Sequence, residues 1–308
     1  MQYLIVAVQE GFLYGILALG IFISLRILNI PDLTTEGSFG VGAAAAAVLA
    51  ADGFPLLSLA AGLLAGAAAG LITGLLQTHL RVHPVLAGII TMSGAYSVKL
   101  IIMRNTTNIP CGPYSIFTLL KRRCAAAGLD GTASKLLACA ACLLMAAVLV
   151  WILVWFFHTN TGLCIRATGD NPDMVRASSI NVNREKRIGL CVSNALIGLS
   201  GALIAHYSSA SDVSTSNGVL VYGLAAVIIG EAVFGRRGVT SGLISAVAGS
   251  VIYKLIYAFV IRSNLFGSYS ANLMKLLCAV IVAVTLAIPA GREDFGRIKR
   301  RWEAKRNA

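Results

Sequence analysis

The sequence predicts an all-α, polytopic membrane protein, and three observations support this fold class. First, 57% of the 308 residues are hydrophobic and only 12% are charged, whereas soluble domains carry about 25% charged residues. Second, several apolar stretches reach the roughly 20 residues that a helix needs to cross a bilayer. Third, the net charge of +12 gathers between these stretches and at the C-terminus, as in loops that set membrane orientation. A soluble enzyme, a disordered chain and a nucleic-acid partner are therefore excluded.

Apolar runs separated by polar breaks predict nine transmembrane or membrane-embedded helices. They lie at 3–24, 37–51, 55–77, 84–103, 136–157, 188–208, 218–234, 240–261 and 272–290. We expect residues 1–290 to form a single transmembrane domain, followed by a basic cytoplasmic tail at 291–308. The first run is interpreted as a retained helix, because no positively charged segment precedes it and no small-residue cleavage site follows it.

A polar stretch separates the first helix from the second, which is short for a membrane span. Residues 30–36 read Ile-Pro-Asp-Leu-Thr-Thr-Glu, and backbone at this depth needs protein or water around it. The stretch 30–40 is therefore expected to face a cavity or a cytoplasmic vestibule. The side chains predicted to line a solute path here are Thr34, Thr35, Glu36 and Ser38. The alternative is that Thr34 or Thr35 only caps the following helix.

Small residues mark the faces on which later helices pack. Four glycines recur every four residues along one face of the helix at 55–77, namely Gly62, Gly66, Gly70 and Gly74. A similar spacing occurs in the helix at 240–261, at Ser241, Ser245 and Gly249. Small residues let helix backbones approach closely in lipid, so we interpret both patterns as packing devices.

The segment 104–135, which follows the fourth helix, is expected outside the membrane. It contains Cys111 and Cys124, and a disulfide is chemically allowed in that compartment. Sequence gives no geometry for such a bridge, so two free thiols remain the alternative.

The loop at 158–187, after the fifth helix, contains the most informative local pattern. Asn171 is a suitable helix N-cap, Pro172 suits the first helical position and Asp173 suits the positive end of the helix dipole. These residues predict a short helix at about 172–180. Its apolar contact set is Met174, Val175, Ala177 and Ile180. Because a free helix of this length is marginal in water, we expect it to dock onto a partner or onto its own membrane domain.

Basic residues predict the orientation of the chain. Most lysines and arginines fall in the tail and in alternate loops, including 158–187 and the loop after 234, whereas 51–54 and 209–217 have none. The N-terminus is therefore predicted outside and the C-terminus inside. The basic segment 104–135 departs from the rule, and the consistent loops outweigh it.

Charged and polar residues inside the spans are candidates for function. Glu10 and Lys254 are intramembrane charges of opposite sign, and pairing across helices is one interpretation, although their depths match only roughly. Lys99 and Lys275 lie nearer outer helix ends, where long stems reach water, so a structural role is expected for both. Asn194 is a further candidate for the solute path, with interhelical hydrogen bonding as the alternative. Glu231 is expected to form a structural ion pair with the adjacent Arg236 and Arg237.

Three stretches of the chain together resemble the permease subunits of branched-chain amino-acid type ABC importers. The residues that match that family's coupling-helix pattern are Arg166-Ala167, Asp170, Met174, Ala177 and Ile180-Asn181, with Ser179 at a usual glycine. Residues 15–47 resemble its first-to-second helix passage. Residues 223–242 resemble its late loop, although Glu231 and Arg236-Arg237 replace a glycine-rich run. The stretch from Asn29 to Gly42, which contains Pro-Asp-Leu-Thr-Thr-Glu-Gly-Ser-Phe, is similar to a branch of that family linked to aromatic amino acids such as tryptophan or tyrosine.

The resemblance implies a mechanism and a set of partners. Two permease copies, expected to be a homodimer, form the path in a bacterial inner membrane. Separate ATPase subunits hold ATP and Mg, and an external binding protein delivers a small amino-acid-like solute. This chain would bind no cofactor and supply no catalytic residue. The residues implied in coupling to the ATPase are Arg166, Asp170, Asn171, Asp173, Met174, Val175, Ala177, Ile180 and Asn181.

Two other classes of protein remain as alternatives to an ABC importer permease. An ion-gradient-driven secondary transporter often shows inverted repeats and midplane charges, and only Glu10 and Lys254 fit that description. An intramembrane enzyme needs a paired nucleophile and base, or metal ligands, within the spans, and neither pattern is visible. No phosphate-binding loop is present either, so energy for uphill transport must come from a partner or an ion gradient.

Overall fold

The computed structural model describes residues 2–126, 128, 131–235, 238–262 and 280. The longer helices are α1 (Gln2–Phe22), α2 (Thr35–Ala51), α3 (Pro55–Thr78), α4 (Pro84–Ile102), α6 (Gly131–His158), α9 (Val182–Ser208), α10 (Val219–Phe234) and α11 (Val239–Arg262). The shorter ones are the π-helix η1 (Ile23–Ile27), α5 (Ile116–Ala126), α7 (Asn160–Asp170), α8 (Pro172–Ala177), and the 3-10 turns η2 (Gly112–Tyr114) and η3 (Val213–Ser216). Two short strands, β1 (Asn108–Pro110) and β2 (Ala210–Asp212), pair antiparallel.

The predicted all-α membrane fold is confirmed, but the predicted number of nine helices is not. Among the described residues, seven helices are long and apolar enough to cross a bilayer, and α2, with 17 residues, is shorter. Eight of the predicted helices therefore have a counterpart. The ninth, at 272–290, lies outside the described residues except for residue 280, and the tail at 291–308 lies outside them entirely. Helices α5 and α7 form within segments that were predicted to be loops.

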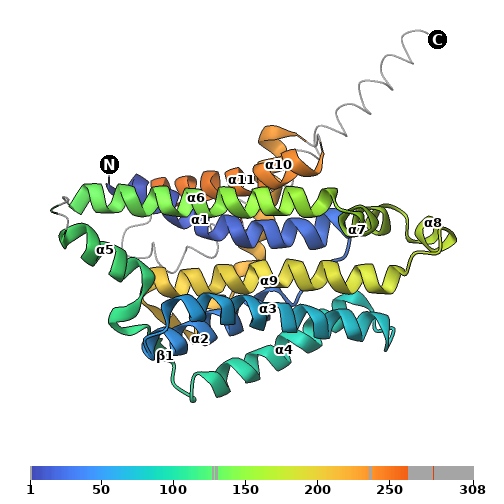
Figure 1. The fold of residues 1–308 in the computed structure, drawn as a ribbon, viewed down its shortest axis with the longest axis horizontal. Coiled ribbons are helices and arrows are strands. Elements are labelled where there is room, and N and C mark those ends of the chain that lie inside the picture. Colours follow the sequence, from blue (N-terminus) through green and yellow to red (C-terminus); the bar gives the residue numbers. More distant parts are fainter. Residues whose placement is uncertain (1, 127, 129–130, 236–237, 263–279, 281–308) are drawn as a thin grey trace, which may run out of the picture.

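Helix α9 lies at the centre of the molecule (Figure 1). It runs between a layer that contains α1 and α6 and a layer that contains α2 and α3, with α4 outside the second layer. In its most apolar window 78% of the residues are buried, compared with 22% for α6. Helix α9 is therefore a core helix, whereas α6 presents most of its surface outward.

The glycine face of α3 is what brings α3 onto α9, as the four-residue spacing predicted. A Cβ atom added at Gly66 would overlap the carbonyl oxygen of Asn194 and would lie 2.9 Å from the Cα atom of Gly198. Gly198 in turn lies against Gly62 and Gly66. The predicted packing face of α11 is also confirmed, because Gly249 lies against the backbone of Ala226 in α10.

Two helices begin in the interior of the membrane domain rather than at its ends. Ser38, in the first turn of α2, donates a hydrogen bond to Asn194, which lies near the middle of α9. The segment that precedes α10 returns to the same region, because the Gly218 amide donates to Glu36 Oε1 at 2.9 Å. The first turns of α2 and α10 therefore meet away from the ends of the long helices; Ser38 is buried there, whereas Gly218 is exposed. Non-helical backbone at this depth needs protein or water around it.

The two long loops predicted on opposite sides of the membrane lie at opposite ends of the molecule. Helices α7 and α8 are at one end, and α5 and β1 are at the other (Figure 1). Cys111 and Cys124, in the segment that contains α5, are both free thiols, so the disulfide is not formed. The Cys111 thiol donates to the Ala205 carbonyl oxygen at 3.3 Å, and burial raises its pKa to about 11.

A glycine-to-alanine pair tests the packing of α3 on α9. Gly66→Ala is expected to destabilise the protein by about 1–3 kcal/mol, because its methyl group would force two backbones apart. Gly94→Ala is the matched control, since a Cβ atom there has no neighbour within 4 Å. The melting temperature of each variant is measured in detergent, as the fraction of protein that still elutes as a folded species from a size-exclusion column after heating. Equal melting temperatures for the two variants would contradict the packing model.

Candidate functional sites

The loop at 158–187 forms a helical hairpin whose turns are closed by asparagine side chains. Asn171 Oδ1 accepts hydrogen bonds from the Asp173 and Met174 amides, both at 3.1 Å, which confirms it as the N-cap of α8. Asn181 Oδ1 accepts from the Arg184 amide at 3.2 Å and caps α9 in the same way. The predicted short helix is confirmed, but it ends at Ala177 rather than near 180.

The apolar residues of α8 do not form the single contact set that was predicted. Val175 is only 3% exposed and faces the protein, whereas Met174 is 68% exposed and Ala177 is also exposed. Ile180, beyond the helix, is half-buried. The prediction failed because a helix of six residues is too short for sequence periodicity to separate its faces. The outward face of α8 therefore consists of Met174, Ala177 and an exposed ion pair between Asp173 and Arg176.

The hairpin packs closely on the end of the first helix. A Cβ atom at Gly169 in α7 would overlap the carbonyl oxygen of Ile27, the last residue of the π-helix η1. Leu28 follows, and its side chain lies against Gly189 in α9. The hairpin thus packs at backbone distance on η1, and the Leu28 side chain in turn places the end of η1 against α9.

A charged cavity of about 400 Å³ lies beside this hairpin. Arg166 and Asp170, two residues of the implied coupling set, help to line it. On the other side, Arg26 forms an ion pair with Glu231 at 2.6 Å. The predicted partners of Glu231, Arg236 and Arg237, lie outside the described residues. The cavity thus brings together charged groups from η1, α7 and α10.

Most of the side chains predicted to line a path are enclosed in a polar network between α2, α3 and α9. Asn194 donates to Asp32 Oδ2 at 2.6 Å and accepts from Ser38 at 2.6 Å. The Thr34 hydroxyl lies 2.7 Å from that of Thr73, and Thr35 bonds to the Asp32 carbonyl oxygen. Thr34, Thr35, Ser38 and Asn194 are all fully buried. In this conformation the network joins helices, and a role for these four residues in a path stays a prediction.

The side chain of Asp32, rather than that of Thr34 or Thr35, caps the turn that leads into α2. Its Oδ1 atom accepts from the Thr34 amide at 2.9 Å, and Thr34 makes no side-chain cap. Asp32 was not among the residues predicted to cap a helix. An aspartate that follows a proline just before a helix is a turn signal, so the sequence did contain a pattern that indicates this role.

Glu36 differs from its neighbours because it lines a second cavity, of about 320 Å³, between α2, α4 and the segment before α10. Lys99 of α4 lines the same cavity and is only 2% exposed. The expectation that Lys99 reaches water at the helix end is therefore wrong. Its Nζ atom donates instead to the Val213 carbonyl oxygen at 2.5 Å and to Ser216 Oγ at 3.1 Å. Lys275, which shared that expectation, lies outside the described residues.

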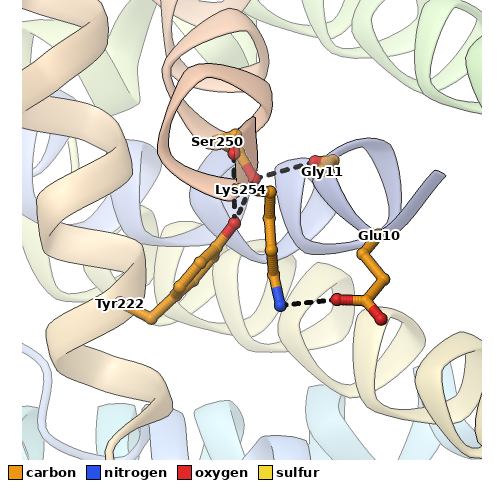
Figure 2. Close-up of polar contacts among 5 residues, drawn as sticks. All are labelled: Glu10, Gly11, Tyr222, Ser250 and Lys254. Carbon is orange, nitrogen blue, oxygen red and sulfur yellow. Dashed lines mark hydrogen bonds and ion pairs between the residues drawn. The ribbon is translucent and has the colours of Figure 1, made fainter. Parts of the chain in front are cut away.

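The predicted pairing of Glu10 with Lys254 is confirmed. Lys254 Nζ lies 2.8 Å from Glu10 Oε2, and Figure 2 shows the two side chains meeting between α1 and α11. The ammonium group also lies 4.3 Å from the ring centre of Tyr14 and 5.4 Å from that of Tyr222, distances at which a cation is attracted to an aromatic face.

A second set of hydrogen bonds fastens the same three helices together. Ser250 donates to the Gly11 carbonyl oxygen at 2.8 Å, and the Tyr222 hydroxyl lies 2.7 Å from Ser250 Oγ (Figure 2). These contacts join α1, α10 and α11. The geometry therefore favours a structural role for the Glu10–Lys254 pair.

Comparisons with known proteins agree on the kind of protein to which this chain is similar. Residues 4–289 match a family described as the permease component of branched-chain amino acid transport systems. A tyrosine transport system permease protein of Clostridioides difficile (strain R20291) is 31% identical over 93% of this chain and 91% of its own length.

Two other relatives are similar over a shorter stretch. The ribose import permease protein RbsC of Escherichia coli (strain K12) is 29% identical over 45% of this chain and 42% of its own length. The probable branched-chain amino acid transport permease protein LivH of Methanocaldococcus jannaschii is 24% identical over 50% of this chain and 47% of its own length. No solved structure was found to match the chain.

The Glu10–Lys254 pair is suited to a double-mutant cycle. Glu10→Gln and Lys254→Met are each expected to destabilise the protein by about 1–3 kcal/mol, because each leaves a partly buried charge unpaired. The double variant removes both charges and is expected to be more stable than either single variant. Thermal unfolding of the four proteins in detergent measures the coupling. Additive losses of stability would show that the pair has no energetic coupling.

Proposed function

The chain belongs to the family of permease components of branched-chain amino acid transport systems, and we propose that it is the transmembrane subunit of an ATP-binding-cassette importer. In this proposal it forms the translocation path for a small amino-acid-like solute. Separate ATPase subunits hydrolyse ATP, and an external binding protein delivers the solute. The apolar helices make it a multi-pass membrane protein, and we place it in the bacterial inner membrane.

The observation that carries this proposal is that α8 has one exposed face while the rest of the hairpin packs closely on the membrane helices. Met174 and Ala177 project from the hairpin, while Val175 and Gly169 fasten it to the rest of the chain. A partner bound to the exposed face could therefore displace the membrane helices rather than only bend a loop. Asn171 and Asn181 hold the hairpin in shape, and Arg166 and Asp170 face the adjoining charged cavity.

We assign the hairpin end of the molecule to the cytoplasm and the end with α5 and the β1–β2 pair to the outside. The positions of basic residues support this orientation, because α7, α8 and the start of α9 carry arginines and lysines. The external segment 104–135 and the first residues of 209–217 are then available to the binding protein, whereas residues 213–216 fold back against Lys99. Residues 1–290 act as one permease domain, and a second identical copy completes the transporter, since closed twofold assembly is the commonest arrangement of identical chains.

The solute that we propose is an amino acid, with an aromatic side chain as the first candidate. The relative that matches across nearly the whole chain is named as a tyrosine transport permease. The ribose permease matches less than half of this chain, and its overlap supports the shared architecture of the permease more than a shared solute.

Charge on the exposed face of α8 is expected to uncouple the permease from its ATPase. Met174→Glu and Ala177→Glu should lower the ATP hydrolysis stimulated by loaded binding protein at least tenfold, because they place an unpaired charge in an apolar contact. Ala51→Glu at the end of α2 is the matched control, since Ala51 is also exposed but lies outside both the hairpin and the segments proposed to meet the binding protein. Membrane insertion should be unchanged in all three. Full stimulation in the α8 variants would overturn the coupling role.

Cysteine labelling at Ala125 and at Ala177 tests the orientation. A membrane-impermeant maleimide is expected to label Ala125→Cys on intact cells and to label Ala177→Cys only after permeabilisation. The parent chain corrects for its native thiols. The reverse pattern would invert the proposed topology.

A further inference from the structure

The cavity that Glu36 and Lys99 share has the size and the lining of a small-molecule site. Its volume of about 320 Å³ is at the lower end of the range for ligand pockets. Three structural elements form it, namely the start of α2, the outer half of α4 and the segment that precedes α10. Its lining residues are Glu36, Gly37, Met92, Ser93, Tyr96, Lys99, Ser216 and Asn217.

Lys99 brings to this cavity a buried positive charge that lacks an opposite charge at contact distance. Its two hydrogen-bond partners, the Val213 carbonyl and the Ser216 hydroxyl, are both neutral, and an ammonium group has three donors. No carboxylate lies within 4.0 Å of it among the described residues. Asp212 acts on it only from farther away, and hydrogen bonds from Ser214 keep the pKa of Asp212 below its usual range. A buried ammonium group is costly unless it is paired, so an anionic group is what this position lacks.

Glu36 supplies the opposite charge on the same cavity. Its Oε1 atom accepts the Gly218 amide, whereas its Oε2 atom accepts no hydrogen bond from the described residues. A carboxylate with a vacant oxygen is a suitable acceptor for a ligand ammonium group. Because Lys99 and Glu36 do not contact each other, the cavity presents one charge of each sign rather than a closed ion pair.

The remaining wall suits a large side chain and faces away from the protein core. Met92 and Tyr96 provide thioether and aromatic surface, and Tyr96 is 47% exposed. On the same outward face, Ser93, Gly94 and Ser97 are exposed. Small and polar residues are typical of protein-facing or water-facing helix surfaces in membranes rather than lipid-facing ones. The stripe of Ser93, Gly94 and Ser97 is therefore suited to border a solute path, although exposed aliphatic residues such as Ile90 and Ile101 lie above and below it.

We infer that this cavity binds the head group of a zwitterionic α-amino acid, with Lys99 holding the carboxylate and Glu36 holding the ammonium group. Met92 and Tyr96 then contact the ligand side chain. The inference rests on the proposed function and makes it more specific, because a neutral sugar or nucleoside has no charges to match this pair.

Equilibrium binding of tritiated L-tyrosine to the purified full-length chain in lipid nanodiscs tests the site without the binding protein. Competition with tyramine, which lacks the carboxylate, and with 3-(4-hydroxyphenyl)propionate, which lacks the ammonium group, reports each half of the site. The wild type is expected to bind L-tyrosine at least tenfold more tightly than either analogue. Lys99→Gln should lose the preference over tyramine alone, and Glu36→Gln should lose the preference over the propionate alone.

Matched controls separate this pattern from general damage. Asp52→Asn at the other end of α2 and Lys121→Gln in α5 remove exposed charges and should leave both preferences within twofold of the wild type. Glu36→Asp and Lys99→Arg keep the charges and should keep the preferences. Equal loss of affinity for all three ligands in the neutral variants would overturn the inference, as would wild-type selectivity in those variants.

The two proposals fail in different ways. Binding of ribose or uridine but of no α-amino acid, by a chain that still stimulates ATPase subunits, would overturn the zwitterion site and leave the importer function intact. The predicted selectivity in a chain that never associates with an ATPase would preserve the site and overturn the importer function.

Discussion

The close approach of α9 to the backbones of α2 and α3 determines where the rest of the membrane domain lies. Apolar side chains give little driving force between helices in lipid, so packing at short range and hydrogen bonds must hold them. Gly42 and Gly66 both lie against Gly198, and Gly201 lies against the Phe39 carbonyl oxygen. No larger residue fits at these contacts without moving a backbone. Helix α9 can then act as the common support of both layers.

From that central position, the polar residues of α9 reach in two directions. Ser193 and Ser200 donate to carbonyl oxygens of α1, at 2.7 and 2.8 Å, while Asn194 joins Asp32 and Ser38 on the other side. Each of these bonds needs a particular register between helices, and a buried polar group left without its partner is costly. The layers therefore cannot slide past α9 freely. A change of state must move groups of helices together, along surfaces that these bonds do not cross.

Features that depend on local composition could be predicted from the sequence, whereas features that depend on distant contacts could not. Apolar runs located the helices, and glycines at every fourth position located the packing face of α3, because each pattern lies within a single short segment of the sequence. The pairing of Glu10 with Lys254 was accessible because opposite charges inside a membrane have few alternatives. The burial of Lys99 was not, since it depends on residues 213–216 folding back into the protein. For the same reason, the Arg26–Glu231 contact had no local signal.

Those distant contacts form a continuous route from the hairpin to the Glu36–Lys99 cavity. Gly169 of the hairpin packs against the carbonyl oxygen of Ile27, in the π-helix η1 that follows α1. Single π-helical turns inside helices are frequent at functional sites. Arg26 in the same turn holds Glu231, near the end of α10. The opposite end of α10 begins beside Gly218, whose amide is bound by Glu36. Because α10 is a single helix of 16 residues, a movement of η1 that Arg26 transmits to Glu231 can also shift Gly218 relative to Glu36. Such a shift changes the surroundings of the cavity carboxylate, and this is how a partner bound at α8, as proposed above, would alter binding at the cavity from a distance.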